Sequence, residues 1–136
     1  MRKRFKFISM LTLALALTFG IGLGAVHAAS WTTFSKELPM MKGNTVLSTK
    51  KKNNNSQAKI QISYIGSTYW ANLWITRDSN GKTVSGTLKN INQSSKTYSL
   101  TVDQSAVGHN VNLNAEAASW SIRNVEISGK WQEDSN

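Results

Sequence analysis

Residues 58–65 read Ala-Lys-Ile-Gln-Ile-Ser-Tyr-Ile, which alternates apolar and polar side chains with a period of two. This period is typical of a β-strand with one buried and one solvated side. Residues 69–76 follow as Tyr-Trp-Ala-Asn-Leu-Trp-Ile-Thr, rich in aromatic and β-branched types, and then comes the polar turn Asp78-Ser79-Asn80-Gly81. These two stretches predict successive strands of a β-protein.

Similar patterns, separated by turn-rich segments, predict the remaining strands. They cover residues 31–34, 45–49, 83–88, 97–102, 107–113, 119–122 and 125–131. No helical period of useful length follows residue 28. About seven to nine short strands with regularly spaced turns predict an all-β fold, a small antiparallel β-sandwich.

The N-terminus has the three-part layout of an export signal. Four basic residues lie within the first six, residues 7–26 carry no charge, and Val26-His27-Ala28 has the small-residue pattern that signal peptidase accepts. We predict a signal peptide over residues 1–28 and a single secreted, extracellular domain over residues 29–136. An uncleaved membrane anchor is the alternative for an apolar run of this length, although no basic stop-transfer cluster follows it.

Composition limits the chemistry of the secreted part. Removal of 28 from 136 residues leaves 108, and four of the 16 Lys and Arg depart while all 7 Asp and Glu stay, so the net charge falls from +9 to +5. This charge favours anionic surfaces without marking a nucleic-acid binder, and no nucleic-acid partner is expected. The chain has no cysteine, which excludes disulfides, thiol catalysis and thiolate metal sites.

No catalytic or metal-binding constellation is predicted. His109 is the only histidine after residue 28, and we expect it to be a half-buried strand residue with a structural role. The scattered acids form no recognisable pair for glycoside hydrolysis. The turn at residues 78–81 imitates the start of a calcium loop, but Lys89 stands where the twelfth-position acid would be, so we expect a simple turn and no metal or other cofactor.

The tryptophans are the main candidates for binding. Trp70 and Trp74 share one side of their strand, with Asn72 between them. Each step of two residues along a strand is about 7 Å, and side chains spaced in this way would suit sugar rings or a lipid interface if exposed. We assign the other three, Trp31, Trp120 and Trp131, to the core.

The turn length decides which way Trp70 and Trp74 point. A two-residue loop at Asn80-Gly81 would leave them exposed, whereas a three-residue loop that includes Ser79 and a bulge would turn them into the core. Asp78 favours the three-residue loop and packing in the core, and both registers remain open.

Lys50, Lys51 and Lys52 precede three asparagines and form a predicted hairpin tip. Such a tip would attract an anionic cell-wall polymer or an anionic lipid. The alternative is a solvated loop that keeps the protein soluble. No aromatic residue is interleaved with the lysines, which disfavours a single-stranded nucleic-acid groove.

The aromatic strand of residues 69–75, its polar glycine turn and the closing stretch Val125-Glu126-Ile127-Ser128-Gly129-Lys130-Trp131 resemble a loose group of exported proteins. These are small, Cys-free β-proteins of Gram-positive bacteria, mostly uncharacterised and some described as bacteriocin-like. The resemblance implies the fold class and secretion. The group has no agreed activity, so no functional residue is carried over.

The sequence therefore predicts a secreted, non-catalytic β-domain that binds at a bacterial cell surface. The candidate ligand-binding residues are Trp70, Asn72, Trp74, Lys50, Lys51 and Lys52, and the expected partner is an anionic cell-wall polymer, a glycan or a lipid surface. The alternatives are a bacteriocin-like antimicrobial protein, a small secreted hydrolase and a structural envelope component.

Overall fold

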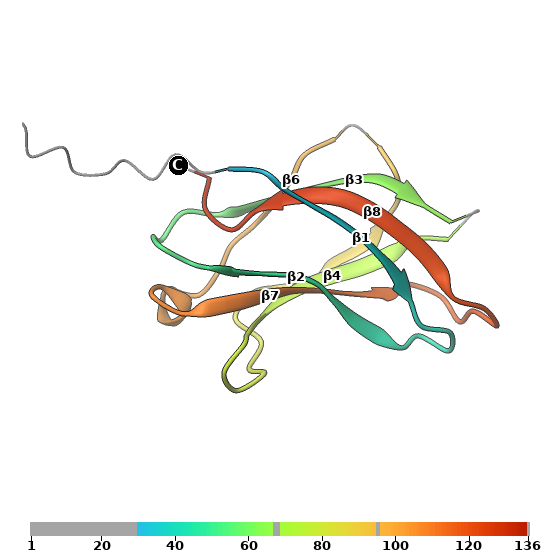
Figure 1. Cartoon of the computed structure of the whole chain (residues 1–136), viewed down its shortest axis with the longest axis horizontal. Helices are drawn as coiled ribbons and strands as arrows, with labels where there is room; N and C mark the ends of the chain where they lie inside the picture. Colours follow the sequence, from blue (N-terminus) through green and yellow to red (C-terminus); the bar gives the residue numbers. More distant parts are fainter. Residues whose placement is uncertain (1–29, 67–68, 95, 136) are drawn as a thin grey trace, which may run out of the picture.

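The structure, a computed structural model, describes residues 30–66, 69–94 and 96–135 (Figure 1). The predicted signal peptide, residues 1–28, lies outside the described residues. The elements are β1 (Thr32–Leu38), β2 (Asn44–Lys51), β3 (Ala58–Ile65), β4 (Ala71–Arg77), β5 (Leu88–Ile91), β6 (Tyr98–Leu100), the 3₁₀ helix η1 (Gln104–Ala106), β7 (Asn110–Ala117) and β8 (Val125–Gln132).

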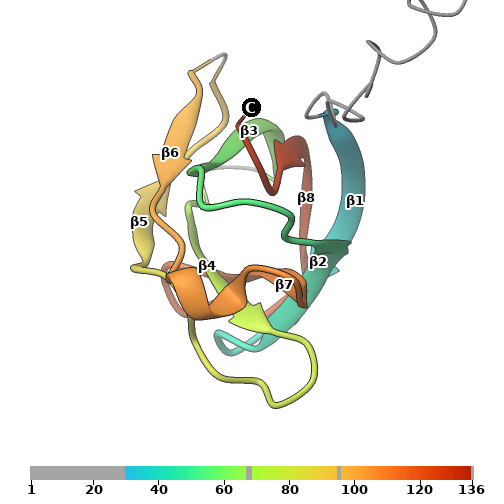
Figure 2. The same ribbon diagram turned by 90° about the vertical axis from the view of Figure 1, so that its left-hand side faces the viewer.

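The strands form two antiparallel sheets that pack face to face, so the predicted β-sandwich is confirmed (Figures 1 and 2). Sheet A has the order β1-β8-β3-β6 and sheet B the order β2-β7-β4-β5. Most connections between successive strands cross from one sheet to the other, and these crossings gather at the two ends of the sandwich. Within the described ranges, no helix is both long and apolar enough to traverse a membrane.

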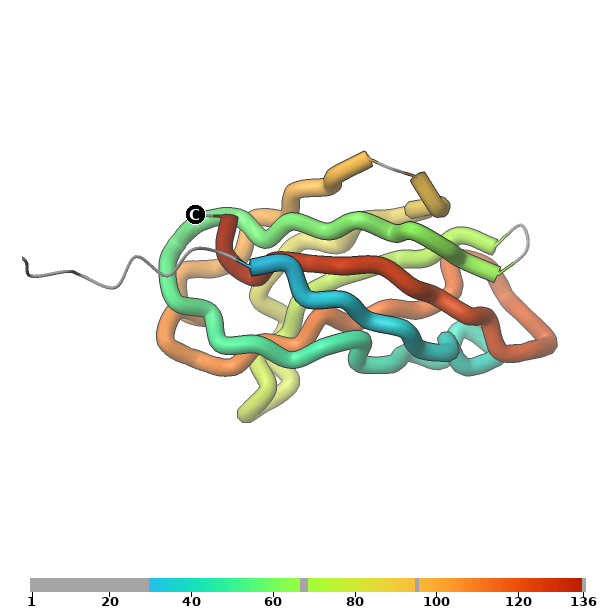
Figure 3. Tube along the Cα trace, turned by 45° about the horizontal axis from the view of Figure 1, so that its top comes forward, coloured from blue at the N-terminus to red at the C-terminus, as the bar shows by residue number. Residues whose placement is uncertain are grey.

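The two ends carry different connections. One, here called the Met40 end, holds the β1–β2 connection (39–43), the described residues of the β3–β4 connection (66, 69 and 70) and the β7–β8 connection (118–124). The other, the Asp134 end, holds the β2–β3 connection (52–57), residues 101–109 around η1 and the last described residues, 133–135. Figure 3 shows that the first strand begins at the Asp134 end, next to the place where the chain finishes.

The core is made by the period-two pattern of the strands. Ile60 and Ile62 of β3 and Leu73 and Ile75 of β4 are fully buried, and they belong to one cluster contributed by both sheets. Trp131 of β8 is also fully buried in this cluster, as predicted. A single apolar core thus holds the two layers together without covalent crosslinks.

Gly129 marks a close approach in the middle of sheet A. It stands opposite Phe34 of β1 and Ile62 of β3. A Cβ atom at this position would lie 2.9 Å from the Phe34 ring and would collide with the carbonyl oxygen of Gln61. Glycine is therefore required here because the space of a side chain is filled by neighbouring strands.

Two of the predicted strands are wrong. Residues 119–122 belong to the β7–β8 connection, because β7 ends at Ala117 and the chain must cross there from sheet B to sheet A. Residues 83–88 form only isolated bridges at Thr83 and Ser85 before β5 starts at Leu88. Short alternating runs predicted strands at both places, but alternation alone does not show that a partner strand lies alongside.

Candidate functional site

Trp70 and Trp74 lie outside the core. Leu73 and Ile75 are fully buried, so Asn72 and Trp74, which alternate with them along β4, point out of the sandwich. Trp74 and Asn72 are half-buried, and Trp70, immediately before the strand, is 48 % exposed. The favoured expectation that these tryptophans pack in the core is wrong.

The turn after β4 explains this orientation. The Arg77 N–H donates to the Lys82 carbonyl (2.8 Å) and the Gly81 N–H donates to the Arg77 carbonyl (2.8 Å), so residues 78–81 form a four-residue loop. Neither predicted loop length is correct. A loop of four residues, like one of two, places the odd-numbered residues of β4 on the inner side of the sheet. A loop of three residues would have placed the even-numbered residues, including Trp74, on the inner side. Gly81 has a φ of 67°, which glycine adopts without strain.

Three rows of side chains cross the outer side of sheet B from β4 through β7 to β2. In register, they are Asn72–Glu116–Asn44, Trp74–Asn114–Val46 and Thr76–Asn112–Thr49. We call this surface the Trp74 face. Its middle row places an amide between two apolar side chains, and the flanking rows are polar.

Asn72 and Glu116 form the accessible polar pair of the Trp74 face. Asn72 Nδ2 donates to Glu116 Oε1 (2.9 Å), and Asn72 Oδ1 accepts from the Asn90 N–H (3.1 Å). Lys42 Nζ lies 3.7 Å from the same Glu116 oxygen. The amide is thus fixed from two sides next to Trp74, while the carboxylate remains half-exposed.

The other amides of β7 brace the face from within. Asn114 Nδ2 donates to Thr76 Oγ1 (2.9 Å), and Asn112 Nδ2 donates to Asp78 Oδ1 (3.0 Å). Asn112 Oδ1 accepts from Thr49 Oγ1 (2.5 Å). Asn112, Asn114 and Thr76 are buried on an outward side and hydrogen-bonded to one another or to neighbouring side chains, whereas Trp74, Asn72 and Glu116 are only partly buried.

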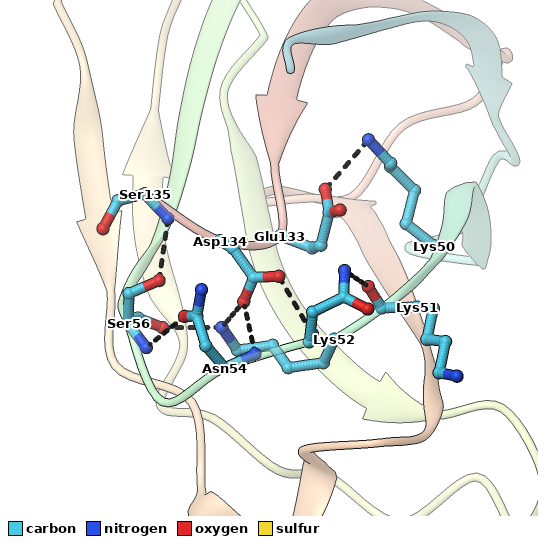
Figure 4. Close-up of polar contacts among 9 residues, drawn as sticks. Lys50, Lys51, Lys52, Asn54, Ser56, Glu133, Asp134 and Ser135 are labelled. Carbon is cyan, nitrogen blue, oxygen red and sulfur yellow. Dashed lines mark hydrogen bonds and ion pairs between the residues drawn. The ribbon is translucent and has the colours of Figure 1, made fainter. Parts of the chain in front are cut away.

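The three lysines do not form a solvated tip (Figure 4). Lys52 is fully buried, and its Nζ lies 2.5 Å from Asp134 Oδ1 and donates to the Ser56 carbonyl (2.6 Å). Lys50 Nζ lies 2.9 Å from Glu133 Oε2. Lys51 alone of the three is exposed. The prediction of a three-lysine binding loop is therefore wrong for Lys50 and Lys52, because carboxylates near the end of the chain neutralise them.

Asp134 is stabilised as a carboxylate. Its burial alone would raise the pKa of this carboxyl group, but the hydrogen bond from Lys52 and those from the N–H groups of Asn53 (2.9 Å) and Asn54 (3.3 Å), together with the positive charge of Lys52, outweigh this effect. The pKa of Asp134 therefore lies below its ordinary value. This arrangement, the Asp134 clamp, fastens the last described residues to the β2–β3 connection.

The groups that catalysis would need are dispersed. His109 is exposed in the turn before β7 and is not the half-buried strand residue expected. Glu37 and Glu126 face one another across β1 and β8, but both are exposed on an open sheet surface where water solvates them. Glu116 stands opposite Asn72, and the Asp78 carboxylate accepts from Asn112, four residues from Glu116 along β7 and about 13 Å away at the rise of a strand. The described residues contain no group of three metal-ligating side chains.

Sheet A carries a shallow groove that the sequence did not indicate. Its volume is about 470 Å³, and it is lined by Thr33, Gln61, Ser63, Gln93, Ser94, Gly129 and Lys130. Beside it, Lys130 Nζ lies 4.8 Å from the centre of the Trp31 ring. The β5–β6 connection contributes to the groove because the Ser94 N–H donates to the Ile62 carbonyl (3.0 Å).

Two tryptophans assigned to the core are exposed. Trp31 is 37 % exposed under Lys130, and Trp120 is 65 % exposed in the β7–β8 connection. Sequence reasoning placed Trp120 in a strand with Ile122, and both side chains instead point to solvent.

Comparison of the chain with protein-family models, curated proteins and solved structures found no match. The likeness to exported proteins of Gram-positive bacteria therefore stays a prediction.

Proposed function

We propose that this chain is a secreted, non-catalytic β-domain that binds at a bacterial cell surface, and that the Trp74 face takes a polyhydroxylated envelope polymer. The observation that carries the proposal is the outward Trp74 next to the Asn72–Glu116 pair. A rigid aromatic side chain beside a fixed amide and a carboxylate on a sheet surface is the combination that a sugar-containing chain requires.

The chemistry of such a ligand matches the face. A sugar ring offers C–H groups on one side, which pack on an indole, and hydroxyl groups at its rim, which need donors and acceptors. Glu116 accepts from hydroxyl groups, and Lys42 at its side adds a cation that an anionic polymer would meet. The hydrogen bonds that hold Asn72 in place before binding reduce the entropy lost on binding.

The absence of catalysis is part of the proposal. Hydrolysis of a glycosidic bond needs two carboxyl groups about 5–10 Å apart, one of them in a desolvated environment. The two carboxylates bordering the Trp74 face are further apart than this, because Asp78 accepts from Asn112, which lies four residues from Glu116 along β7, or about 13 Å at the rise of a strand. The exposed Glu37–Glu126 pair lacks the desolvated environment.

Sedimentation with purified Gram-positive cell walls tests the proposal. We expect the protein to sediment with the walls and Trp74→Ala to lower the affinity by at least about tenfold, as for a central aromatic contact. Trp31→Ala is the matched control, because Trp31 is a partly exposed tryptophan on the outer side of the opposite sheet. Equal loss in both variants, or no binding by the unaltered protein in low salt, would refute a role for the Trp74 face.

Three further measurements separate the alternatives. A binding protein should leave related strains growing in a zone-of-inhibition assay, whereas a bacteriocin-like protein should kill them. A hydrolase should release soluble fragments from the same cell walls. Secretion requires that the extracellular protein begins at residue 29, which N-terminal sequencing determines.

A further inference from the structure

The exposed apolar side chains of this protein gather at one end. Among the residues that the structure describes, most of the large hydrophobic side chains that are exposed lie in the connections of the Met40 end: Met40 (44 %), Met41 (57 %), Trp70 (48 %), Trp120 (65 %) and Ile122 (79 %). In Figure 1 the β1–β2 and β7–β8 connections form the right-hand tip of the sandwich. Scattered exposed hydrophobic residues need no explanation, but a cluster from three connections at one tip does.

The β7–β8 connection has an inverted polarity. Trp120 and Ile122 point to solvent while Ser121 between them is buried. The reverse orientation would bury two large apolar side chains and hydrate a hydroxyl group, and it is the arrangement that the sequence predicted. The β7–β8 connection therefore leaves two large apolar side chains exposed instead of burying them, which indicates that Trp120 and Ile122 contact something other than water.

The β1–β2 turn exposes its methionines at a conformational cost. The Gly43 N–H donates to the Met40 carbonyl (3.2 Å), and the two residues between, Met41 and Lys42, have φ values of 59° and 58°. Two positive φ values are the signature of a type I′ turn, for which Asn-Gly is the preferred sequence. Met41 and Lys42 are larger than Asn and Gly and adopt this conformation less easily. Their presence indicates that these two positions are occupied for the chemistry of the side chains and not because they favour the turn.

The tip is braced from within. The Met41 N–H donates to the Ser121 carbonyl (2.8 Å), and the Ala118 N–H donates to the Trp70 carbonyl (2.7 Å). The Met40 N–H donates to Asn124 Oδ1 (3.2 Å). These bonds tie the connections to one another and satisfy backbone donors without water, as is required of any segment that enters a lipid phase.

From these observations we propose that the Met40 end inserts into the interface of a lipid bilayer, with Met41, Trp120 and Ile122 as the inserting side chains. Tryptophan prefers the boundary between headgroups and acyl chains, and an unbranched methionine and an isoleucine add apolar area below it. Arg123 lies next to Ile122 in sequence and supplies a cation for anionic headgroups, whereas Lys42 is paired with Glu116. This inference does not depend on the Trp74 face.

A bilayer fits the tip better than a second copy of the chain. A stable protein–protein interface takes about 20–30 residues on each side, and the tip offers a handful of side chains on narrow loops. The net charge of +5 after removal of residues 1–28 opposes self-association and favours an anionic membrane.

Vesicle sedimentation tests the inference. The secreted protein should bind vesicles of equimolar phosphatidylglycerol and phosphatidylcholine more strongly than vesicles of phosphatidylcholine alone, and brominated acyl chains should quench its tryptophan emission. Trp120→Ser/Ile122→Ser should lower the partition coefficient by at least about tenfold. Trp120→Phe should bind with reduced quenching, which identifies the inserted ring.

Matched controls keep the result specific. Val46→Ser and Tyr64→Ser also remove exposed apolar side chains, but from strands and not from the tip connections, and should bind vesicles like the unaltered protein. Trp74→Ala should keep vesicle binding even where it loses cell-wall binding. The inference is overturned if the unaltered protein ignores both vesicles in low salt or if the double variant binds equally well. It is likewise overturned if the double variant converts a dimer into a monomer, because self-association would then explain the exposed residues.

Discussion

The two ends of the sandwich differ in which side chains they bury and which they expose. At the Asp134 end, the fully buried charge of Lys52 is matched by a carboxylate at 2.5 Å, and the described residues 52–57, 101–109 and 133–135 expose no large hydrophobic side chain. At the Met40 end, Trp120 and Ile122 are exposed around a buried serine. One end is organised to close the fold, and the other departs from what folding alone would favour. That departure is the basis of the proposal that the Met40 end inserts into a bilayer.

The largest expected effect lies at the Asp134 end. Lys52→Met should destabilise the protein by about 3–5 kcal/mol, because it leaves the buried Asp134 carboxylate without its partner. Lys51→Met, which alters an exposed neighbour, should change the free energy of unfolding by less than about 0.5 kcal/mol. Urea denaturation measures both. A Lys52→Met/Asp134→Asn double variant should be milder than the sum of its two single variants, and additive effects would rule out the Asp134 clamp.

Gly129→Ala tests the region between the two ends. The added methyl group would press on the Phe34 ring and the Gln61 carbonyl, so we expect a loss of about 1–3 kcal/mol in the free energy of unfolding. Gly86→Ala is the control, since a Cβ atom there would have nothing within 4 Å. Similar thermal midpoints for the two variants would contradict the tight packing of sheet A.

Acid should weaken the Asp134 end selectively. The pKa of Asp134 is lowered in the folded protein, so folding is favoured while its carboxyl group is ionised in both states. This contribution is complete above the ordinary value of 3.8 and is lost as the pH falls through the lower folded pKa. Stability measured between pH 5 and about pH 2 should therefore decline more steeply in the unaltered protein than in Asp134→Asn. Parallel curves would show that Asp134 is not the group responsible.

At the Met40 end, a substitution should stabilise the fold and impair lipid binding together. Met41→Asn/Lys42→Gly places the preferred residues in a turn with two positive φ values and should raise the free energy of unfolding by about 1–2 kcal/mol. The same variant should bind vesicles less well, because it removes Met41, one of the proposed inserting side chains. Thermal melting and vesicle sedimentation on one sample check both expectations. A destabilised variant would show that the turn is not strained.

The smallest expected effect separates the two ends most clearly. Trp120→Ser/Ile122→Ser should leave the free energy of unfolding within about 0.5 kcal/mol of the unaltered protein, because both side chains are exposed. Its effect on vesicle binding should nevertheless be large. A substantial loss of stability would mean that these side chains support the fold, and the contrast between the ends would then disappear.

The fold class could be predicted from the sequence because burial imposes a period of two on each strand. Ile60 and Ile62 identify the inner side of β3 in this way, and Trp131 is part of the same pattern in β8. The orientation of Trp74 could not be predicted, since a change of one residue in the length of the 78–81 loop exchanges the two sides of β4. Loop length depends on hydrogen bonds such as that between Arg77 and Lys82, which local sequence does not specify.

The lysine tract and the Trp120 segment both show that local sequence does not determine the exposure of a side chain, and the two errors have opposite signs. Lys50 and Lys52 look solvated in sequence, but Glu133 and Asp134, about 80 residues away, come to lie beside them. Trp120 and Ile122 look buried because they alternate with serines, but no strand pairs with them. In both cases the environment of a side chain is decided by a contact with a distant segment.

The sequence by itself determined that the part of the chain after residue 29 is a sandwich of short strands around one apolar core, because side chains that alternate between apolar and polar show locally which side of a strand is buried. The tertiary structure alone decided which tryptophans face water, which lysines are neutralised and where the exposed apolar side chains meet. Those properties depend on how connections far apart in the chain are brought to the same end of the molecule, and no local pattern encodes that.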